Sequence, residues 1–407
     1  MGMRALRLPR VAAPLRHRDF RLLWLGQTFT LIGTFVSNVA YPFQILQLGG
    51  SALELGTLIS IYTASNLVFL LVGGAVADRV ARRTLIVLTE LGSGLVVGIL
   101  AILGFAGVIQ IWHLYVAVAY FGAATAFSVP ALGAIVPELV PEEILIPGNA
   151  VRGLSLQIGR TGGPIIGGLL VALLGPAAAF AFDAVSFLGS AGLVALTRSR
   201  PLEARAASSF FADIREGLAF VFSVQWLWVT IFGFALVNAA HIAAVVVALP
   251  LLVTQVIGGG APMYGVVVAA TGVGEAVGAA AIAQVRIRRT GPAMYLFAVV
   301  GGVAIALYGL VPTIAGAMTA SFLLGISFTC FAVLWMSALQ RHVTRNMLGR
   351  VTSVDWFGGT LLAPVAPIAA ALLVSTVGPA ALFVIAGAIV TSLTLAGLLL
   401  PSIRRLE

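Results

Sequence analysis

Long apolar stretches alternate with short polar, arginine-rich ones along the whole chain. Each apolar stretch has about 20 residues or more, which is enough for an α-helix rising about 1.5 Å per residue to cross a hydrocarbon core of about 30 Å. The pattern predicts twelve membrane-spanning helices, over residues 20–47, 55–77, 84–107, 111–136, 149–174, 177–197, 224–256, 263–285, 293–312, 314–340, 350–375 and 379–401. We therefore predict an all-α membrane protein with twelve transmembrane helices.

Arginine is concentrated at alternate ends of these spans. The chain has 23 arginines and no lysine, and all but Arg160 lie before the first span, after the last, or beside the connections after every second span. Because cytoplasmic loops carry the excess of positive charge, both termini are predicted to be cytoplasmic. The basic stretch before Phe20 then forms a cytoplasmic tail and not a cleaved signal peptide.

Composition agrees with a membrane protein. The chain is 60% apolar and 9% charged, with a mean hydropathy of +1.09, outside the range of soluble domains. The arginines at the cytoplasmic ends of the spans account for the formal charge of +9, so no nucleic-acid partner is expected. Arginine without lysine, with much alanine and glycine, points to the cytoplasmic (inner) membrane of a prokaryote with a GC-rich genome. The single cysteine, Cys330, excludes an internal disulfide and a thiolate metal site.

The spans form two groups of six. We predict an N-terminal bundle over 1–197, a cytoplasmic linker over 198–222 and a C-terminal bundle over 223–407. Within the linker, apolar residues recur at helical spacing, which predicts an amphipathic helix in the membrane interface. These residues are Phe210, Phe211, Ile214, Leu218 and Val221. The alternative is an irregular solvated loop.

The two groups resemble distant copies of each other. "GGAVADRVARR" follows the second span and "AAAIAQVRIRR" the eighth, an offset of 206 residues that aligns Arg82 and Arg83 with Arg288 and Arg289. An offset of 203 residues places Pro164 on Pro367. Two six-helix repeats are typical of transporters whose substrate cavity lies between the halves.

Residues 74–83, "GAVADRVARR", resemble the loop motif of the major facilitator superfamily, although Ala81 replaces its second glycine. The matching residues are Gly74, Asp78, Arg79, Arg82 and Arg83. A carboxylate beside guanidinium groups forms charge-assisted hydrogen bonds. We infer a cytoplasmic gate that links this loop to Asp355 at the start of the eleventh span. The alternative is a solvated charge cluster that only sets topology.

Residues 159–168, "GRTGGPIIGG", resemble the antiporter motif of the fifth helix in the same superfamily, although Ala150 stands where the motif has an upstream glycine. The matching residues are Gly159, Gly163, Pro164, Gly167 and Gly168. Glycines four residues apart allow close helix contact. Pro164 lacks an N–H, so the Arg160 carbonyl loses its helical partner and the helix can bend.

The resemblance extends over essentially the whole chain. Its details are "NAVRGLSLQIGRTGGP" at 149–164, "FDAVSFLGSA" at 182–191 and "ADIREGLAFV" at 212–221, which resemble the branch that holds bacterial enterobactin exporters and macrolide and multidrug efflux proteins. The resemblance implies proton-driven export by alternating access. The predicted function is a drug/proton antiporter for bulky amphipathic or cationic organic compounds. A dedicated siderophore or lipid exporter is the alternative, followed by a proton-coupled importer.

Arg160 lies about 11 residues into its span, or roughly 16 Å deep, and Glu275 lies at a similar depth in the eighth span. A charge at such depth faces a cavity or a partner. We predict that Glu275 is the proton-carrying carboxylate, since desolvation favours its protonated form and a nearby Arg160 its ionised form. Asp183 and Glu90 both lie nearer to span ends, and Asp183 ranks second. The alternative is a permanent ion pair that holds the halves together.

Few polar residues lie at mid-span. The predicted substrate cavity contains Asn38, Tyr41, Tyr62, Asn66, Phe127, Asn238, His241, Phe331 and Trp335. Each amide or imidazole could instead form a hydrogen bond between helices, and each aromatic ring could lie in the core or face lipid. So apolar a cavity suits an amphipathic compound better than a sugar or phosphate ester.

Other classes of function fit the sequence poorly. The four histidines are widely separated and no lysine-containing nucleotide loop exists, so we expect no enzyme, no metal and no cofactor beyond the coupling proton. A receptor or lipid scramblase on the same fold is a further alternative. The expected partners are a small-molecule substrate, protons and the lipid bilayer, and we expect a monomer.

Overall fold

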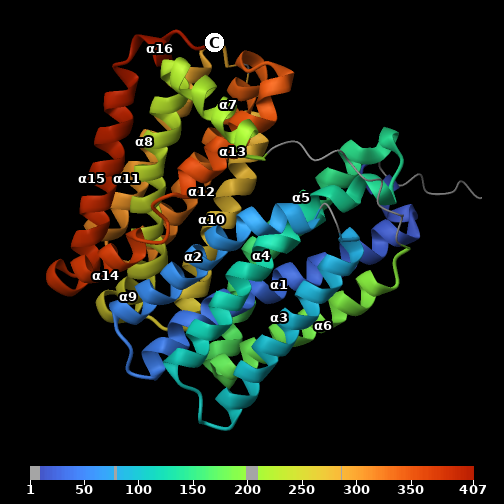
Figure 1. Ribbon diagram of the computed structural model, residues 1–407. Coiled ribbons are helices and arrows are strands. Elements are labelled where there is room, and N and C mark those ends of the chain that lie inside the picture. The colour runs from blue at the N-terminus through green and yellow to red at the C-terminus, as the bar shows by residue number, and fades with distance from the viewer. Residues whose placement is uncertain (1–9, 78–79, 199–209, 286) are drawn as a thin grey trace, which may run out of the picture. The chain divides into compact units, whose positions relative to one another are not determined.

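The computed structural model describes residues 10–77, 80–198, 210–285 and 287–407, and within these ranges the chain forms helices and no strands (Figure 1). The first half contains α1 (Arg18–Gln47), α2 (Ala52–Ala77), α3 (Arg82–Phe105), α4 (Ile111–Leu139), α5 (Leu145–Leu174) and α6 (Pro176–Ala195). Two short 3₁₀ turns precede α1 and α5, at Arg10–Arg16 and Glu142–Ile144.

The second half begins with α7 (Phe210–Ser223). It continues with α8 (Gln225–His241), π-helical turns at Ile242–Ala248 and Leu252–Val256 around α9 (Leu249–Leu251), α10 (Ala261–Ile282), α11 (Thr290–Leu310), α12 (Ile314–His342), α13 (Arg345–Thr360), α14 (Ala366–Val377), α15 (Pro379–Leu398) and α16 (Pro401–Arg404). Pro250 lies between the π-helical turns. Its missing N–H removes one regular helical bond, which accounts for the irregularity.

Eleven long apolar helices in the described residues can cross a membrane, one for each predicted span except the eleventh. The eleventh is broken, since a turn at 361–365 separates α13 from α14. Pro364 and Pro367 both lack an N–H, and the turn is held by short-range bonds such as the one from Ala363 N to Thr360 O at 2.9 Å. The corresponding helix α5 has a proline in its first turn, Pro147, but only Pro164 in its interior, and it is continuous. A second proline therefore explains the break.

The internal repeat is visible in matching turns. α5 and α14 both end at a glycine with positive φ, Gly175 (82°) and Gly378 (81°), and a proline follows each of them. The two glycines are 203 residues apart, the offset that also relates Pro164 to Pro367. Only glycine adopts this left-handed geometry without strain.

Helix contacts repeat as well. α3 packs on α6, and α11 packs on α15. Gly94 of α3 lies against Leu188 of α6, and Gly302 of α11 lies against Thr391 of α15 in the same way. α11 therefore corresponds to α3 at an offset of 208 residues and not 206, so Arg288 and Arg289 precede α11, whereas Arg82 and Arg83 open α3. The aligned arginines of the two loops do not occupy equivalent positions.

The described residues group into two compact units, Met1–Gln44 with Ile61–Arg205, and Ile45–Ser60 with Ala206–Glu407. The first unit has a core around Phe20, Ile86 and Ile135. The second has a core around Trp226, Tyr295 and Leu339.

Part of the predicted linker, 199–209, lies outside the described residues, and its remainder forms α7 in the second unit. Val221 of α7 is fully buried in the second core, and Leu218 packs against that core. Glu216 forms an ion pair with Arg350 of α13, with 2.8 Å between Oε1 and Nη1. This end of α7 therefore packs on protein.

Replacement of Gly378 by alanine should lower thermal stability. A Cβ at positive φ costs about 1–2 kcal/mol, and a loss of 1 kcal/mol lowers the Tm by roughly 2–4 °C in a unit of this size. Cys330 is 1% exposed in the same unit, so a thiol-reactive dye reports when that unit opens. Gly233→Ala in α8, where a Cβ would meet no atom, is the control and should not lower the Tm. An unchanged Tm in Gly378→Ala would show that the left-handed turn is not required.

Candidate functional site

Arg160 and Glu275 lie in different units, on α5 and α10. Glu275 is 8% exposed, and its backbone packs closely on α12, because a Cβ at Gly325 would stand 2.8 Å from the Glu275 nitrogen. Both residues have interaction partners. Their pairing with each other, and a proton on Glu275, stay predictions.

Asn66 of α2 occupies the position in the first half that Glu275 occupies in the second. A Cβ at Gly122 of α4 would stand 2.9 Å from the Asn66 nitrogen, which is the contact that Gly325 makes with Glu275. The Asn66 amide donates across this contact to the Gly122 carbonyl at 3.1 Å. A carboxyl group in the same geometry could donate such a bond only when protonated. The repeat therefore places an ionisable group in one half where the other half has a neutral donor.

In the loop motif, Asp78 and Arg79 lie outside the described residues, while Gly74 lies in the last turn of α2. Arg82 binds the end of α4, donating to the Ala134 carbonyl at 3.2 Å and pairing with the Glu138 carboxylate.

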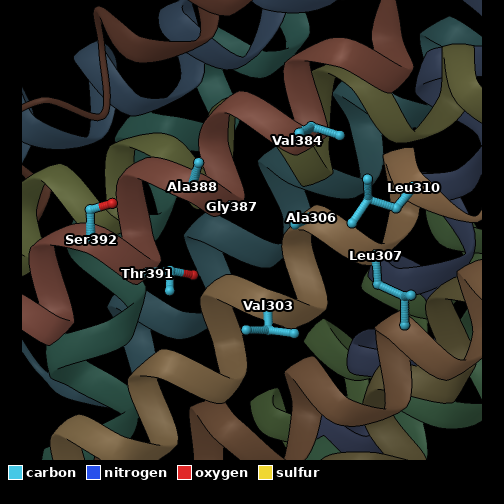
Figure 2. Close-up of a pocket in the computed structure, with 9 residues that line it drawn as sticks. All are labelled: Val303, Ala306, Leu307, Leu310, Val384, Gly387, Ala388, Thr391 and Ser392. Atoms are coloured by element: carbon cyan, nitrogen blue, oxygen red, sulfur yellow. The ribbon is translucent and has the colours of Figure 1, made fainter.

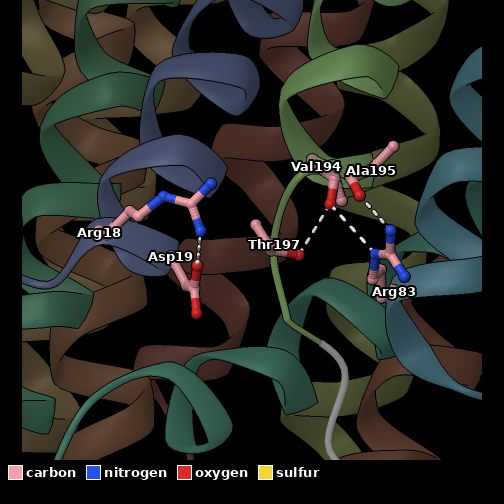
Figure 3. A network of polar contacts seen from close by, with 6 residues as sticks. All are labelled: Arg18, Asp19, Arg83, Val194, Ala195 and Thr197. Atoms are coloured by element: carbon pink, nitrogen blue, oxygen red, sulfur yellow. Dashed lines mark hydrogen bonds and ion pairs between the residues drawn. The ribbon is translucent and has the colours of Figure 1, made fainter.

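Arg83 binds the end of α6. It donates to the Val194 carbonyl at 3.4 Å and also to the Ala195 carbonyl, as Figure 3 shows. The last carbonyls of a helix lack helical partners and carry partial negative charge, so a guanidinium stabilises them. Arg82 and Arg83 thus bind other helices of the N-terminal unit itself, a role that the sequence did not predict. The predicted gate to Asp355 stays a prediction.

Asp355 is held within the second unit. Its Oδ2 accepts a hydrogen bond from the indole Nε1 of Trp335 at 2.9 Å, which joins α13 to α12. Trp335 is 8% exposed and packs edge-to-face on Trp226, with ring centroids 5.8 Å apart. The indole N–H, the only polar group of the Trp335 side chain, therefore has its partner within the second unit.

The glycine motif of α5 packs on α1. A Cβ at Gly167 would stand 2.7 Å from the Val36 carbonyl oxygen, and one at Gly159 3.1 Å from the Phe35 ring. Gly163 also lies against Phe35, and both Pro164 and Gly168 are buried. The close helix contact predicted for these glycines is confirmed, and it lies within the first unit. An antiport role for the motif stays a prediction.

Several residues predicted for the substrate cavity make contacts within one unit. Asn238 of α8 donates to the Gly359 carbonyl at 3.2 Å, and the Tyr62 hydroxyl to Thr125 Oγ1 at 3.4 Å. Asn66 and Asn238 therefore both use their side-chain amide to join two helices. Asn38 is exposed and His241 half-buried.

The predicted aromatic residues pack on other rings. Tyr41 is 9% exposed, with its ring centroid 5.1 Å from that of Phe180. Phe331 stacks on Phe234 at 4.0 Å, and Phe127 is 6.2 Å from Phe69. These contacts support the alternative of core packing for Tyr41 and Phe331. Direct contact of any of these rings with a substrate stays a prediction.

Two buried carboxylates lie inside the first unit, Glu90 at 5% exposure and Asp183 at 2%. Glu90 accepts a hydrogen bond from the Gln27 amide of α1, and Asp183 from the Ser186 hydroxyl at 3.2 Å. Sequence reasoning placed both near span ends and missed their burial between helices. The signal was the spacing of small and polar residues on α6, where Asp183, Ser186 and Ser190 share one face.

A groove with a volume of about 410 Å³ lies between α11 and α15 (Figure 2). It is lined by Val303, Ala306, Leu307, Leu310, Val384, Gly387, Ala388, Thr391 and Ser392. Two hydroxyl groups are its only polar side-chain groups, and none of the residues predicted for the substrate cavity lines it. It has too few polar groups to fix the orientation of a substrate.

Comparison with known proteins agrees with the helical architecture. The nucleoside transporter NupG superimposes with a TM-score of 0.76 at 12% identity, over 95% of this chain and 98% of that one. A bacterial homologue of the iron transporter ferroportin in an inward-facing state superimposes with a TM-score of 0.73 at 16% identity, over 93% and 98%. Identities this low show the fold alone.

Sequence relatives are exporters. The enterobactin exporter EntS of Salmonella choleraesuis (strain SC-B67) is 25% identical over 349 residues, or 83% of this chain and 81% of the relative. EntS of Shigella dysenteriae serotype 1 (strain Sd197) is 27% identical over 353 residues with the same coverage. The sequence model of the transmembrane secretion effector family matches residues 10–350.

The helices, their repeat and these relatives define a multi-pass membrane transporter of the major facilitator superfamily for small molecules, and not an enzyme. Within that superfamily, the chain belongs to the transmembrane secretion effector family.

Replacement of Arg83 by glutamine should destabilise the protein. The change removes a charge from the end of α6, and such an interaction contributes up to about 2 kcal/mol when partly buried. Melting of the purified protein in detergent measures the effect, and Arg83→Lys should lose less because the charge remains. Arg18→Gln is the control in the same unit, since its side chain is 55% exposed and, among the described residues, forms an ion pair only with neighbouring Asp19 (Figure 3). Equal melting of wild type and Arg83→Gln would contradict a capping role.

Proposed function

We propose that the protein exports a bulky amphipathic organic compound from a bacterial cell by proton-coupled alternating access. A catecholate siderophore is the substrate class to test first, and lipophilic cationic drugs are the second. The enterobactin exporters, similar over 83% of this chain, carry the proposal of direction and substrate class.

The scarcity of available polar groups supports an amphipathic substrate. Asn66, Asn238 and the indole of Trp335 are engaged in hydrogen bonds inside their own units. A sugar or phosphate ester would need several polar groups directed at it. Exposed Asn38 and half-buried His241 remain as proposed polar contacts, beside the rings of Tyr62, Phe127 and Phe331.

Glu275 is the proposed coupling carboxylate, with Arg160 as its partner and Asp183 as a second candidate. Glu275 is buried on α10, where the equivalent residue of the other half is a neutral amide. Protonation would make it neutral too, and deprotonation would create a buried charge that favours a cationic partner. Movement of one half against the other could thereby load and release the proton.

Transport into everted membrane vesicles tests the proposal. Vesicles from an efflux-deficient strain are energised by respiration and supplied with radiolabelled enterobactin or, separately, with a fluorescent lipophilic cation. We expect the protein to accumulate enterobactin above vesicles that lack it, and a protonophore to abolish the accumulation. Glu275→Gln should reduce accumulation to the level without the protein, because the variant cannot release a proton.

Glu143→Gln is the matched control, because Glu143 is exposed in the turn before α5. It should transport as the wild type does. Accumulation of the cation but not of enterobactin would favour the drug antiporter over the siderophore exporter. Full protonophore-sensitive transport by Glu275→Gln would reject the role of that carboxylate, and accumulation that survives the protonophore would reject proton coupling.

A further inference from the structure

A seam of polar residues lies between α1, α3 and α6 in the first unit. Ser190 of α6 lies against Gly26 of α1, where its Oγ is 2.8 Å from the position of an added Cβ. Two turns away on α6, Asp183 Oδ1 is 2.6 Å from an added Cβ at Gly33. The two glycines therefore bring α1 close enough to face both residues. Glu90 reaches the same seam from α3 by its bond with Gln27.

Neutral groups surround both carboxylates. Among the described residues, Glu90 bonds to the Gln27 amide with the Ser190 hydroxyl beside it, and Asp183 bonds to Ser186 with the Tyr41 phenol nearby. Apart from terminal turns of α1 and α4, the other ionisable side chains on the helices packed around the seam are Arg82, Arg83, Tyr115, Tyr120, Arg152 and Arg160. No arginine in the described chain forms an ion pair with either carboxylate. Two negative charges here would have no counter-charge.

Buried polar atoms of the seam also lack regular hydrogen bonds. In the described part of the chain, Glu90 Oε2, Ser190 Oγ, Ser37 Oγ and the Tyr41 hydroxyl are buried and complete no hydrogen bond of regular geometry, although Ser190 lies beside Glu90 and Ser37 beside Asp183. Ser190 is fully buried and Ser37 is 2% exposed. An ionised carboxylate with one of its oxygens lacking a regular hydrogen bond at this place is costly. A proton on Oε2 removes the charge and gives Glu90 a donor for a neighbouring hydroxyl oxygen.

The repeat offers an internal comparison. The offsets that relate α3 to α11 and α6 to α15 place Glu90 on Ala298 and Asp183 on Ala386. Pro42 and Pro250 relate α1 to α8, which places Gln27 on Ala235. All three alanines are buried, at 4–5% exposure. The helix packing of the second half is thus made without any of these polar groups, so packing alone does not require them in the first half.

We propose that Glu90 and Asp183 form a proton-binding pair inside the N-terminal bundle, separate from Glu275. Each carboxyl takes up a proton at low pH and releases it as the pH rises. Their use as coupling protons rests on the proposed transport function, whereas the binding of protons does not.

Infrared spectroscopy of the full-length protein in lipid nanodiscs tests the binding directly. A protonated carboxyl has a C=O stretching band that ionised carboxylates lack, and a titration in H₂O and D₂O identifies it. We expect the wild type to show buried carboxylic-acid bands that fade as the pH is raised. Glu90→Gln and Asp183→Asn should each remove one component, and the double variant should remove both.

Two controls separate this site from other acids. Glu54→Gln changes a carboxylate bonded to Ser51 at the start of α2, and Glu275→Gln changes the proposed coupling residue; both should leave the two components in place. If the amide variants fail to fold, the double variant Glu90→Ala and Asp183→Ala replaces them, because the second half has alanine at both equivalent positions. Bands that persist in a folded double variant, or a wild type without them, would overturn the proposal. The vesicle assay is independent, so a protein that moves neither compound but shows these bands would disprove the transport proposal alone.

Discussion

Hydrocarbon offers no hydrogen bonds, so every polar group of a membrane-embedded chain must find its partner within the protein. This constraint accounts for most of the side-chain contacts that join helices here. Asn66 and Asn238 each donate to a carbonyl of a neighbouring helix, and Trp335 uses its indole N–H on Asp355. Arg82 and Arg83 likewise bind the open carbonyl ends of α4 and α6. Few polar groups then remain for a substrate.

Hydropathy and arginine placement predicted nearly all of the helices, because both report directly on the membrane. The break between α13 and α14 was missed, since a single proline often bends a helix without ending it, as Pro164 does not end α5. The effect of Pro364 and Pro367 together depends on local turn geometry that hydropathy does not contain.

The candidate site was predicted less completely. Glycine spacing correctly indicated the close contact of α5 with a neighbour, because a row of residues without side chains lets the backbone of another helix approach. Depth along a helix did not reveal that Glu90 and Asp183 are enclosed, since burial depends on which face meets another helix. Likewise, the partners of Asn66 and Trp335 come from distant parts of the chain, and no local pattern identifies them.

Residues 403–406 contact the start of α11 in the second unit. Leu406 accepts a hydrogen bond from the Gly291 nitrogen at 3.0 Å, Arg404 donates to the Leu398 carbonyl at 2.5 Å, and Ile403 is fully buried. These residues are synthesised more than a hundred positions after the start of α11, which they contact. The start of α11 therefore lacks this partner while α12 to α15 are synthesised. In the first unit, Arg83 itself joins the start of α3 to the last carbonyls of α6, so that contact can form as soon as α6 is inserted.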